Sequence, residues 1–164
     1  ETQIIMKLEN KNISVIGLGK TGIAVANFLS QRGARVTVMD SKPREQFLET
    51  LKQLRADVKT NFQNSEPPAD TELVVLSPGV DINAMFLQTA RSAGIEIISE
   101  IELASRFNTV PIVAVTGTNG KSTCTSLIAE IISQSGKTVH AGGNLGIPFI
   151  SLISLFLTCL KLFD

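Results

Sequence analysis

The sequence predicts an α/β protein in which a parallel sheet is covered by helices on both faces. Short apolar runs alternate along the chain with longer segments whose apolar residues recur at the spacing of a helix. The short runs are apolar throughout, which is typical of strands buried on both faces of a sheet. Regular alternation of strand and helix implies right-handed crossovers between parallel strands, so we expect a doubly wound sheet.

The first 108 residues supply the elements of one such domain. Five strands are expected, at 13–16, 36–39, 57–59, 73–76 and 95–98. Helical stripes of apolar residues lie at 25–29, 47–54 and 86–93, and a further helix is expected at 100–107. Gly33 and Gly94 stand where two of these helices should end, since glycine readily adopts the left-handed conformation found after a helix C-terminus. Residues 1–108 are therefore predicted to form one small domain.

A second unit is expected after the turn Asn108-Thr109-Val110-Pro111. Strands are expected at 112–115 and 137–141, and between them an apolar helical stripe at 127–132 is followed by Gly136. Two strands and two helices are too few for an independent hydrophobic core. We therefore expect residues 109–164 to be the truncated start of a second α/β domain.

The apolar segment 149–160 belongs to this second unit. It has 12 uncharged residues, whereas a bilayer needs about 20. We therefore expect no membrane association, and either a buried helix or a sequence whose natural continuation is missing. The segment is expected to cover the apolar faces of strand 112–115 and helix 127–132; the alternative is that the chain associates through those faces.

The charge and cysteine content argues against several classes of protein. Fifteen Lys and Arg balance fifteen Asp and Glu, which argues against a protein that binds nucleic acid mainly by neutralising phosphates. Two distant cysteines and a single histidine argue against a structural zinc site and a disulfide framework. The first residues do not resemble a signal peptide. We therefore expect a cytoplasmic protein.

A glycine-rich turn joins the first expected strand to the first expected helix. Its sequence, Gly17-Leu18-Gly19-Lys20-Thr21-Gly22, matches the pattern G-x-G-x-x-G. Gly17 permits a tight turn, Gly19 lets a phosphate approach the backbone, and Gly22 lets the helix pack closely on the strand. Asp40, 18 residues after Gly22, stands where an acidic residue often holds a ribose hydroxyl. This Rossmann-like motif predicts binding of a nucleotide phosphate without specifying the nucleotide; the alternative is a turn needed only for packing.

A second glycine-rich turn links strand 112–115 to the next helix. It reads Gly117-Thr118-Asn119-Gly120-Lys121-Ser122-Thr123. Its Gly-Lys-Ser triplet has the chemistry of a P-loop, in which backbone N–H groups surround the phosphates, the lysine reaches the outer phosphates and the serine hydroxyl ligates Mg²⁺. Val115 stands where the strict motif has its first glycine. The position between a strand and a helix nevertheless favours nucleotide binding.

The remaining polar candidates carry weaker signals. Cys124 is expected to be a small buried residue rather than a nucleophile, and His140 is expected to be structural. Asn144 follows the last expected strand, at the end where ligands of α/β proteins bind, and is a site candidate. Glu100 and Glu102 are interpreted as charges at a helix N-terminus rather than as a catalytic pair.

The order of the two glycine motifs is unusual, and with their flanking residues it resembles the Mur ligases of peptidoglycan synthesis. The matching segments are 17–22, 77–80 (Ser-Pro-Gly-Val), 112–123 and 142–146. The resemblance runs from about Asn12 to Pro148. The Thr-Asn-Gly-Lys-Ser-Thr form of the second loop, together with Ser-Pro-Gly, favours the D-glutamate-adding branch of that family.

The resemblance implies that the first domain binds the UDP of a nucleotide sugar rather than NAD. The implied contacts are Gly19, Lys20 and Thr21 on the diphosphate, Asp40, Ser41 and Lys42 around the uracil end, and Gly79 on the same ligand.

For the second domain the resemblance implies binding of ATP and Mg²⁺ by residues 117–123. Lys121 would neutralise the transferring phosphoryl group, Ser122 would hold the metal, and Asn144 would touch the substrate or the phosphates. ATP would phosphorylate the alanine carboxylate of UDP-N-acetylmuramoyl-L-alanine, and the amine of D-glutamate would then displace phosphate.

After Pro148 the chain departs from the family pattern. The family's acidic and histidine magnesium ligands, its modified lysine and its third domain, which would complete the ATP and D-glutamate sites, have no counterpart in this sequence. We therefore expect that this chain by itself does not ligate D-glutamate. Three alternatives stay open: an NAD-dependent oxidoreductase domain, a nucleotide-hydrolysing switch or kinase, and a non-catalytic nucleotide-binding remnant.

Overall fold

A five-stranded parallel sheet organises the chain. The computed structural model describes residues 6–143 and 146–153. The strands are β1 (Asn12–Ile16), β2 (Arg35–Asp40), β3 (Lys59–Phe62), β4 (Leu73–Leu76) and β5 (Glu96–Ser99). The helices are α1 (Lys20–Ser30), α2 (Leu48–Leu51), α3 (Gln88–Ser92), α4 (Glu100–Phe107) and α5 (Lys121–Gln134), with 3-10 helices η1 (Arg44–Phe47) and η2 (Met85–Leu87). The strand order is β3-β2-β1-β4-β5 with every pairing parallel, which confirms the predicted fold class.

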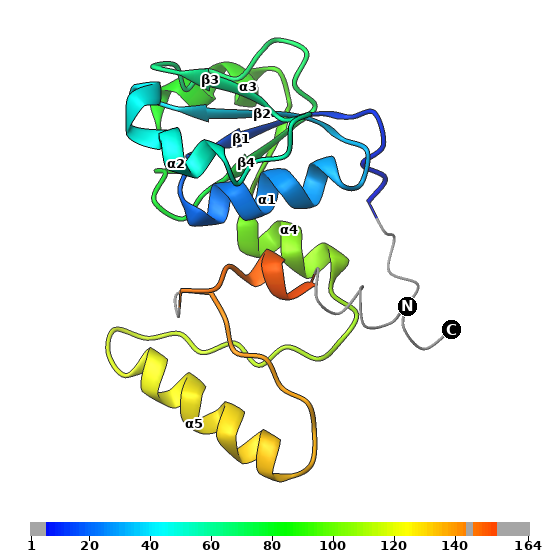
Figure 1. Cartoon of the computed structure of the whole chain (residues 1–164), viewed down its shortest axis with the longest axis vertical. Coiled ribbons are helices and arrows are strands. Elements are labelled where there is room, and N and C mark those ends of the chain that lie inside the picture. The colour runs from blue at the N-terminus through cyan, green and yellow to red at the C-terminus, as the bar shows by residue number, and fades with distance from the viewer. Residues whose placement is uncertain (1–5, 144–145, 154–164) are drawn as a thin grey trace.

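The central strands are buried on both faces, as their apolar composition predicts. Val15 and Val38 face the larger core, which also contains side chains of α1, α4 and the helical segment 149–153. Met39 and Leu76 face a smaller core that includes residues of α3. Figure 1 shows α1 and α4 on one side of the sheet and α3 on the other. This layering leaves the ends of the strands free to form a site.

Aromatic contacts join α1 to α4. The rings of Phe28 and Phe107 meet edge to face with their centroids 5.2 Å apart. The guanidinium of Arg32 lies 3.5 Å from the centre of the Phe28 ring. Such cation–π contacts are attractive because the ring face is electron-rich. The last helix of the first domain is thereby fixed against its first helix.

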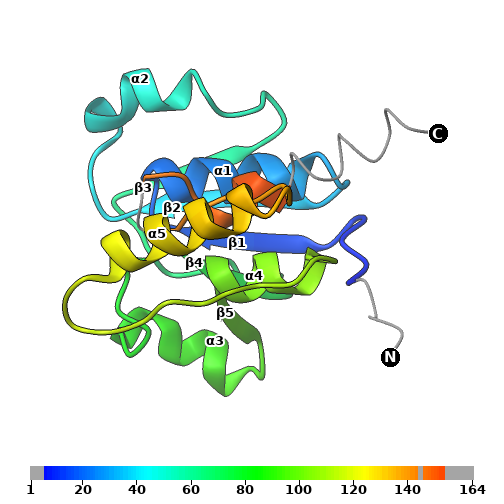
Figure 2. The ribbon, with the colours of Figure 1, turned by 90° about the horizontal axis from the view of Figure 1, so that it is seen from below.

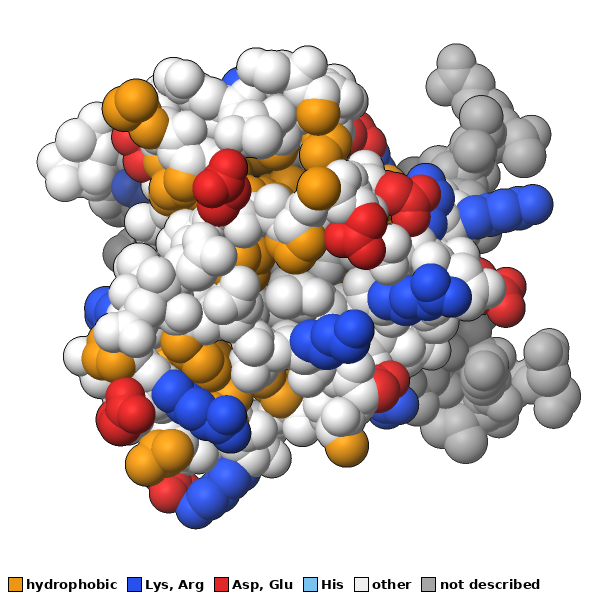
Figure 3. All heavy atoms as spheres, turned by 90° about the horizontal axis from the view of Figure 1, so that it is seen from above, with side chains coloured by type: hydrophobic (Ala, Val, Ile, Leu, Met, Phe, Trp, Pro, Cys, Tyr) orange, Lys and Arg blue, Asp and Glu red, His pale blue; other side chains and the backbone are white. Residues whose placement is uncertain are grey.

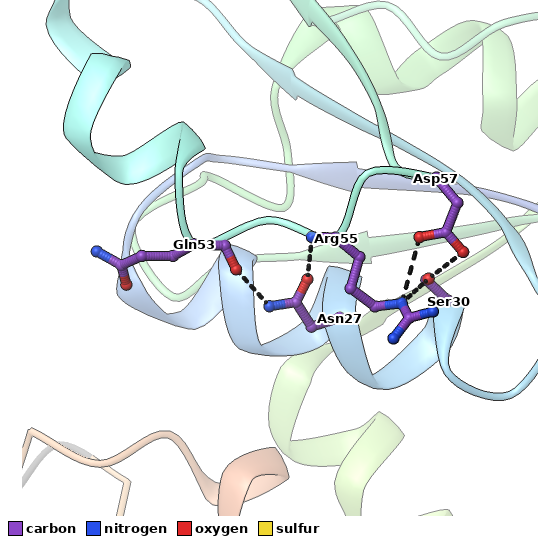
Figure 4. Close-up of polar contacts among 5 residues, drawn as sticks. All are labelled: Asn27, Ser30, Gln53, Arg55 and Asp57. Atoms are coloured by element: carbon purple, nitrogen blue, oxygen red, sulfur yellow. Dashed lines mark hydrogen bonds and ion pairs between the residues drawn. The ribbon is translucent and has the colours of Figure 1, made fainter.

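Polar side chains of α1 hold the crossover between α2 and β3 (Figure 4). Asn27 donates from Nδ2 to the carbonyl of Gln53 at 2.8 Å and accepts at Oδ1 from the backbone N–H of Arg55 at 3.0 Å. The hydroxyl of Ser30 donates to Asp57 and accepts from Nε of Arg55, both at 2.8 Å. The hydrogen bond from Ser30 is the largest cause that lowers the pKa of Asp57. These contacts fix a connection that has little regular structure of its own.

Two predicted elements of the first domain differ from the observed ones. The helix predicted at 47–54 is shorter and is divided between η1 and α2. The strand predicted at 57–59 begins instead at Lys59, which pairs with Thr37. Both differences have one cause, because residues 53–57 are drawn into a turn by their hydrogen bonds to Asn27 and Ser30. Local apolar spacing does not reveal these long-range polar contacts.

In the second unit the described residues form helix α5 and a short helical segment at 149–153. The strands predicted at 112–115 and 137–141 are wrong: both segments are irregular, and neither pairs with a strand of the described sheet. A strand needs a neighbour for its backbone hydrogen bonds. The predicted helix forms as α5 and is followed by Gly136 at φ +80°, yet it buries none of its residues. Leu127 and Ile131 are about 60% exposed.

The described part of the apolar tail packs on the first domain. Residues 149–153 are helical, and Ile150 and Ile153 are buried in the larger core. The prediction of a buried helix is confirmed for residues 149–153. The expectation that the tail covers helix 127–132 is wrong for these residues. Residues 154–164 lie outside the described residues.

None of the helices formed by the described residues is both long and apolar enough to cross a membrane.

Acidic and basic side chains are interspersed on the face shown in Figure 3, with apolar side chains between them. The mixture agrees with the equal numbers of acidic and basic residues in the sequence. Neither sign of charge dominates this face.

Candidate functional site

The carboxyl ends of β1, β2 and β4 are hydrogen-bonded to one another. The N–H of Gly17, after β1, donates to the carbonyl of Met39 in β2 at 2.7 Å. The Ser77 hydroxyl, after β4, donates to the carbonyl of Gly17 at 3.0 Å. The chain crosses from β1 to β2 on one side and places β4 on the other, so the strand order reverses beside β1. Ligands of open α/β sheets bind at the carboxyl edge at such a reversal.

The three glycines of the first loop have different surroundings. Gly17 has φ +96°, and a Cβ there would lie 3.0 Å from Cβ of Ser77. A Cβ on Gly22 would lie 1.9 Å from the carbonyl oxygen of Gly17. A Cβ on Gly19 would meet no described atom within 4 Å. The tight turn predicted at Gly17 and the close packing predicted at Gly22 are confirmed, and Gly19 faces open space.

Two long helices begin next to these glycine loops without a capping side chain. Gly19 is the N-cap of α1 and Gly120 the N-cap of α5, and within these described helices the first turn carries no acidic residue. The first helical residues are instead Lys20 and Lys121. A cation is unfavourable at the positive end of a helix. Free N–H groups beside a lysine are, however, what a phosphate requires.

The second loop is folded around its lysine. Gly117 and Gly120 have φ of +147° and +75°, in the region that glycine adopts readily. Nζ of Lys121 donates to the carbonyls of Gly117 at 2.5 Å and Thr118 at 3.3 Å. The ammonium therefore lies at the loop, while Ser122 and Thr123 are exposed. The prediction that Cys124 is buried is wrong, because no described element covers this face of α5.

Most of the other predicted contact residues follow strand ends. Asp40 accepts from the backbone N–H of Leu18 at 2.8 Å and from that of Lys42 at 2.9 Å, one bond on each carboxylate oxygen. Ser41 is exposed beside it. Gly79 is exposed after β4, and a Cβ there would meet no described atom within 4 Å. These residues lie at the same edge as Gly19, Lys20 and the half-buried Thr21.

The two glycine loops lie on the same side of the molecule. Figures 1 and 2, related by a quarter turn, both show the start of α1 and the start of α5 toward the left. The candidate Asn144 lies outside the described residues.

Two residues of this region were not identified as functional from the sequence. Ser77 joins the β4 loop to the first glycine loop; its segment 77–80 was noted for the resemblance, but no role was assigned to the Ser77 side chain. Glu100 was interpreted as an N-terminal helix charge, yet it is 3% exposed and accepts from the N–H of Ile150 at 2.7 Å. Burial raises the pKa of Glu100, against the opposing effect of hydrogen bonds from the backbone of Ile150 and Phe149. Glu102, in contrast, is exposed and forms an ion pair with Arg106.

A cavity of about 400 Å³ lies at the opposite edge of the sheet. Its lining includes Leu73 and Glu96, the first residues of β4 and β5. Arg106 in the same lining already forms an ion pair with Glu96 at 2.7 Å. Ligands of parallel sheets bind at the carboxyl edge rather than at this amino edge. Among the described residues no group of three or more His, Cys, Asp or Glu could hold a metal.

Comparison with known proteins gives the family. The model of the N-terminal domain of MurD-like Mur ligases matches residues 11–99. The chain belongs to the MurD-like Mur ligase family. This range contains the first glycine loop, Asp40 and the Ser77–Gly79 turn, and the resemblance drawn from the sequence is confirmed.

Full-length relatives extend well beyond this chain. The chain is 48% identical over 151 residues to the UDP-N-acetylmuramoylalanine--D-glutamate ligase of Geobacter metallireducens and 45% identical over 153 residues to that of Geotalea uraniireducens. The alignments cover 90% and 91% of this chain, and therefore both glycine loops, but 33% and 34% of the relatives. The chain thus spans about a third of the length of the curated relatives it matches.

Among solved structures, a pseudomurein peptide ligase type C from Methanothermus fervidus is 26% identical, with a TM-score of 0.45. That match covers 77% of this chain and 27% of the ligase.

Proposed function

We propose that this chain is the nucleotide-binding N-terminal part of an ATP-dependent ligase that joins D-glutamate to UDP-N-acetylmuramoyl-L-alanine. The observation that carries the proposal is the pair of glycine-capped helices, α1 and α5, that each begin with a lysine and open on the same side of the molecule (Figures 1 and 2). Two phosphate-bearing ligands held on one side are what a reaction between a nucleotide sugar and ATP requires.

The first loop is proposed to bind the UDP portion of the sugar substrate. The open space at Gly19 lets a diphosphate reach the N–H groups at the start of α1, and Lys20 adds a positive charge there. Thr21 offers a hydroxyl on the same turn. The residues after β2, Asp40, Ser41 and Lys42, are proposed to surround the uracil end, and the exposed Gly79 borders the ligand from β4.

The second loop, residues 117–123, is proposed to bind ATP. Gly117, Thr118, Asn119 and Gly120 supply backbone, and Lys121 is the cation closest to the phosphates. Mg²⁺ bound with ATP would neutralise phosphate charge, and the exposed Ser122 is the residue that would ligate it, with Thr123 beside it. A hydroxyl oxygen in the first turn of α5 suits this hard cation, whose other ligands are commonly phosphates and waters.

The proposed reaction has two steps. The carboxylate of the sugar-linked alanine attacks the γ-phosphorus of ATP, which gives an acyl phosphate and ADP. The neutral amine of D-glutamate then attacks the acyl carbon, the amide bond forms, the carbonyl–oxygen bond breaks so that phosphate leaves, and the proton lost by the nitrogen passes to phosphate or water. In the first step Lys121 stabilises charge on the transferring group, which is the main contribution that a protein makes to phosphoryl transfer. Asn144 is proposed to contact the substrate or the phosphates.

D-Glutamate recognition is proposed to belong to the part of the relatives that this chain does not span. We expect the reaction to take place in the cytoplasm, because UDP-sugars and ATP are its substrates. An NAD-binding oxidoreductase domain is the main alternative. Titration with UDP and with NADH separates the two alternatives.

Lysine variants test whether each loop binds its own nucleotide. Lys20→Ala should lower the affinity for UDP at least tenfold and leave the affinity for Mg·ATP unchanged. Lys121→Ala should abolish Mg·ATP binding and leave the affinity for UDP unchanged. Lys137→Ala, which removes an exposed lysine beyond α5, is the matched control. Calorimetric titration measures all four proteins. Equal ATP affinity in Lys121→Ala and the unchanged chain would show that the second loop is not the ATP site.

A further inference from the structure

The glycine turn that follows the second loop is held on the segment 149–153. The N–H of Gly143 donates to the carbonyl of Ile147 at 2.7 Å. A Cβ on Gly142 would lie 2.6 Å from Cδ1 of Leu152 and 3.2 Å from the carbonyl oxygen of Ile147. Leu152 itself is buried. The backbone at Gly142 and Gly143 therefore has little freedom to move relative to the segment 149–153.

Glu100 in turn fixes that segment to the first domain. Oε1 of Glu100 accepts from the N–H of Ile150 at 2.7 Å, in the first turn of the helical segment. Ile150 and Ile153 are 0% and 2% exposed within the larger core. The first N–H groups of a helical turn lack partners inside the helix, so a buried carboxylate is a strong acceptor for them. A continuous path of contacts thus runs from α4 through residues 149–153 to the glycine turn.

The glycine turn lies between the two glycine loops. In Figures 1 and 2 the orange segment that contains it lies on the same side as the start of α1, and in Figure 1 it stands between α1 and α5. A ligand that extends from the first loop toward the second would therefore run on the side of the molecule where this turn lies. UDP alone, bound at the first loop, need not reach it.

We propose that Glu100 is a positioning residue that holds the turn at Gly142 and Gly143 against the part of a UDP-linked substrate extending beyond the diphosphate. The proposal rests on the proposed function, because it takes UDP as the group bound at the first loop. An ionised carboxyl group is costly to bury. An apolar residue at position 100 would suit the core but could not accept the hydrogen bond that Glu100 receives from the N–H of Ile150, so the carboxylate serves the placement of residues 149–153.

Two substitutions at position 100 separate positioning from simple stability. Glu100→Gln keeps an oxygen that can accept from Ile150, whereas Glu100→Ala removes it. Glu102→Ala is the matched control, because it removes an exposed carboxylate two residues away on α4. Each full chain is titrated with UDP and with UDP-N-acetylmuramoyl-L-alanine, and hydrogen exchange is followed over residues 146–153.

The expected result is a difference between the two ligands. Glu100→Ala should lower the affinity for the UDP-sugar at least tenfold, keep the affinity for UDP within twofold, and speed hydrogen exchange at 146–153. Glu100→Gln and Glu102→Ala should resemble the unchanged chain in all three measurements. Equal weakening of both ligands, or no weakening of either, would overturn the positioning role. An unchanged chain that binds neither ligand would overturn the proposed function, and the positioning role with it.

A second variant keeps the test decisive if Glu100→Ala does not fold. Gly142→Val places a side chain where Leu152 and the Ile147 carbonyl already lie, so it displaces the turn and leaves Glu100 in place. It should weaken the UDP-sugar at least tenfold and leave UDP within twofold. Unchanged affinity for the UDP-sugar in this variant contradicts the proposal.

Discussion

The carboxylate of Asp40 accepts a hydrogen bond from the backbone N–H of Leu18 across 2.8 Å, so the end of β2 braces the first glycine loop. Its second oxygen accepts from the N–H of Lys42 at 2.9 Å. The acidic residue of the motif thus stabilises the loop conformation itself. A ligand bound at Gly19 meets a loop whose shape is already set.

Removing this brace should weaken both the fold and the site. In Asp40→Ala two backbone N–H groups lose a charged acceptor, and such hydrogen bonds contribute about 1.5–3 kcal/mol each. We expect a loss of about 3 kcal/mol in the free energy of unfolding, the lower end for two such bonds because the one from Lys42 is exposed, and at least tenfold weaker UDP binding. Asp40→Asn keeps one acceptor oxygen, so its stability and its UDP affinity should lie between those of the unchanged chain and Asp40→Ala. Urea unfolding and calorimetry provide the measurements, and an alanine variant with unchanged stability would contradict the bracing role.

The glycines at 19 and 22 should separate binding from folding. Gly22→Ala would place Cβ 1.9 Å from the Gly17 carbonyl oxygen, so it should destabilise the chain by about 3 kcal/mol, the upper end of what overpacking costs. Gly19→Ala has an ordinary φ of −83° and free space, and should cost less than about 1 kcal/mol. Its methyl group would nevertheless occupy the space proposed for phosphate, so UDP affinity should fall at least tenfold. Equal effects of the two variants on unfolding would contradict this assignment.

The Asn27 side chain should be a stability determinant distant from the ligand. Asn27→Ala leaves the carbonyl of Gln53 and the N–H of Arg55 without their partner, and each lost hydrogen bond costs about 0.5–1.5 kcal/mol. Asn27→Asp keeps the acceptor for Arg55 but turns an oxygen instead of an N–H toward the carbonyl of Gln53, so it should cost at least as much as Asn27→Ala. Thermal unfolding of the unchanged chain, Asn27→Ala and Asn27→Asp gives the order of their stabilities. Identical melting temperatures would show that the crossover does not depend on this side chain.

Stability should depend on the ionisation of Glu100. Because burial raises its pKa above the ordinary 4.5, the folded chain binds this proton more tightly than the unfolded chain does. The contribution to stability is therefore fully present below pH 4.5 and is lost as the pH rises through the folded-state pKa. Glu100→Gln stays neutral and should flatten this decline. Urea unfolding from pH 4 to pH 8 gives both profiles, and parallel profiles would contradict the prediction.

The first domain could be predicted closely because its determinants are local. Uniformly apolar runs identified four of its strands to within one residue at either end, and Glu100–Phe107 was predicted at its observed bounds. The prediction for the region around Asp57 failed because its hydrogen bonds to α1 connect residues about 27 positions apart. The predictions of strands at 112–115 and 137–141 were wrong because a strand depends on neighbouring strands for its hydrogen bonds as well as on its own composition.

The candidate site was predictable where backbone chemistry decides it. Glycines that precede a helix specify an N-terminus without a capping side chain, and the structure has one at Gly19 and one at Gly120, although the strand predicted before Gly117 is absent. The role of Glu100 was not predictable, because its partner Ile150 is 50 residues away and contributes only a backbone N–H. No side-chain pattern in the sequence records such a contact.

Titration of the unchanged chain with UDP and with NADH tests the central claim most directly. The account predicts saturable UDP binding that Gly19→Ala weakens at least tenfold, with no measurable NADH binding. Tight NADH binding together with absence of UDP binding would contradict the account and favour an oxidoreductase domain.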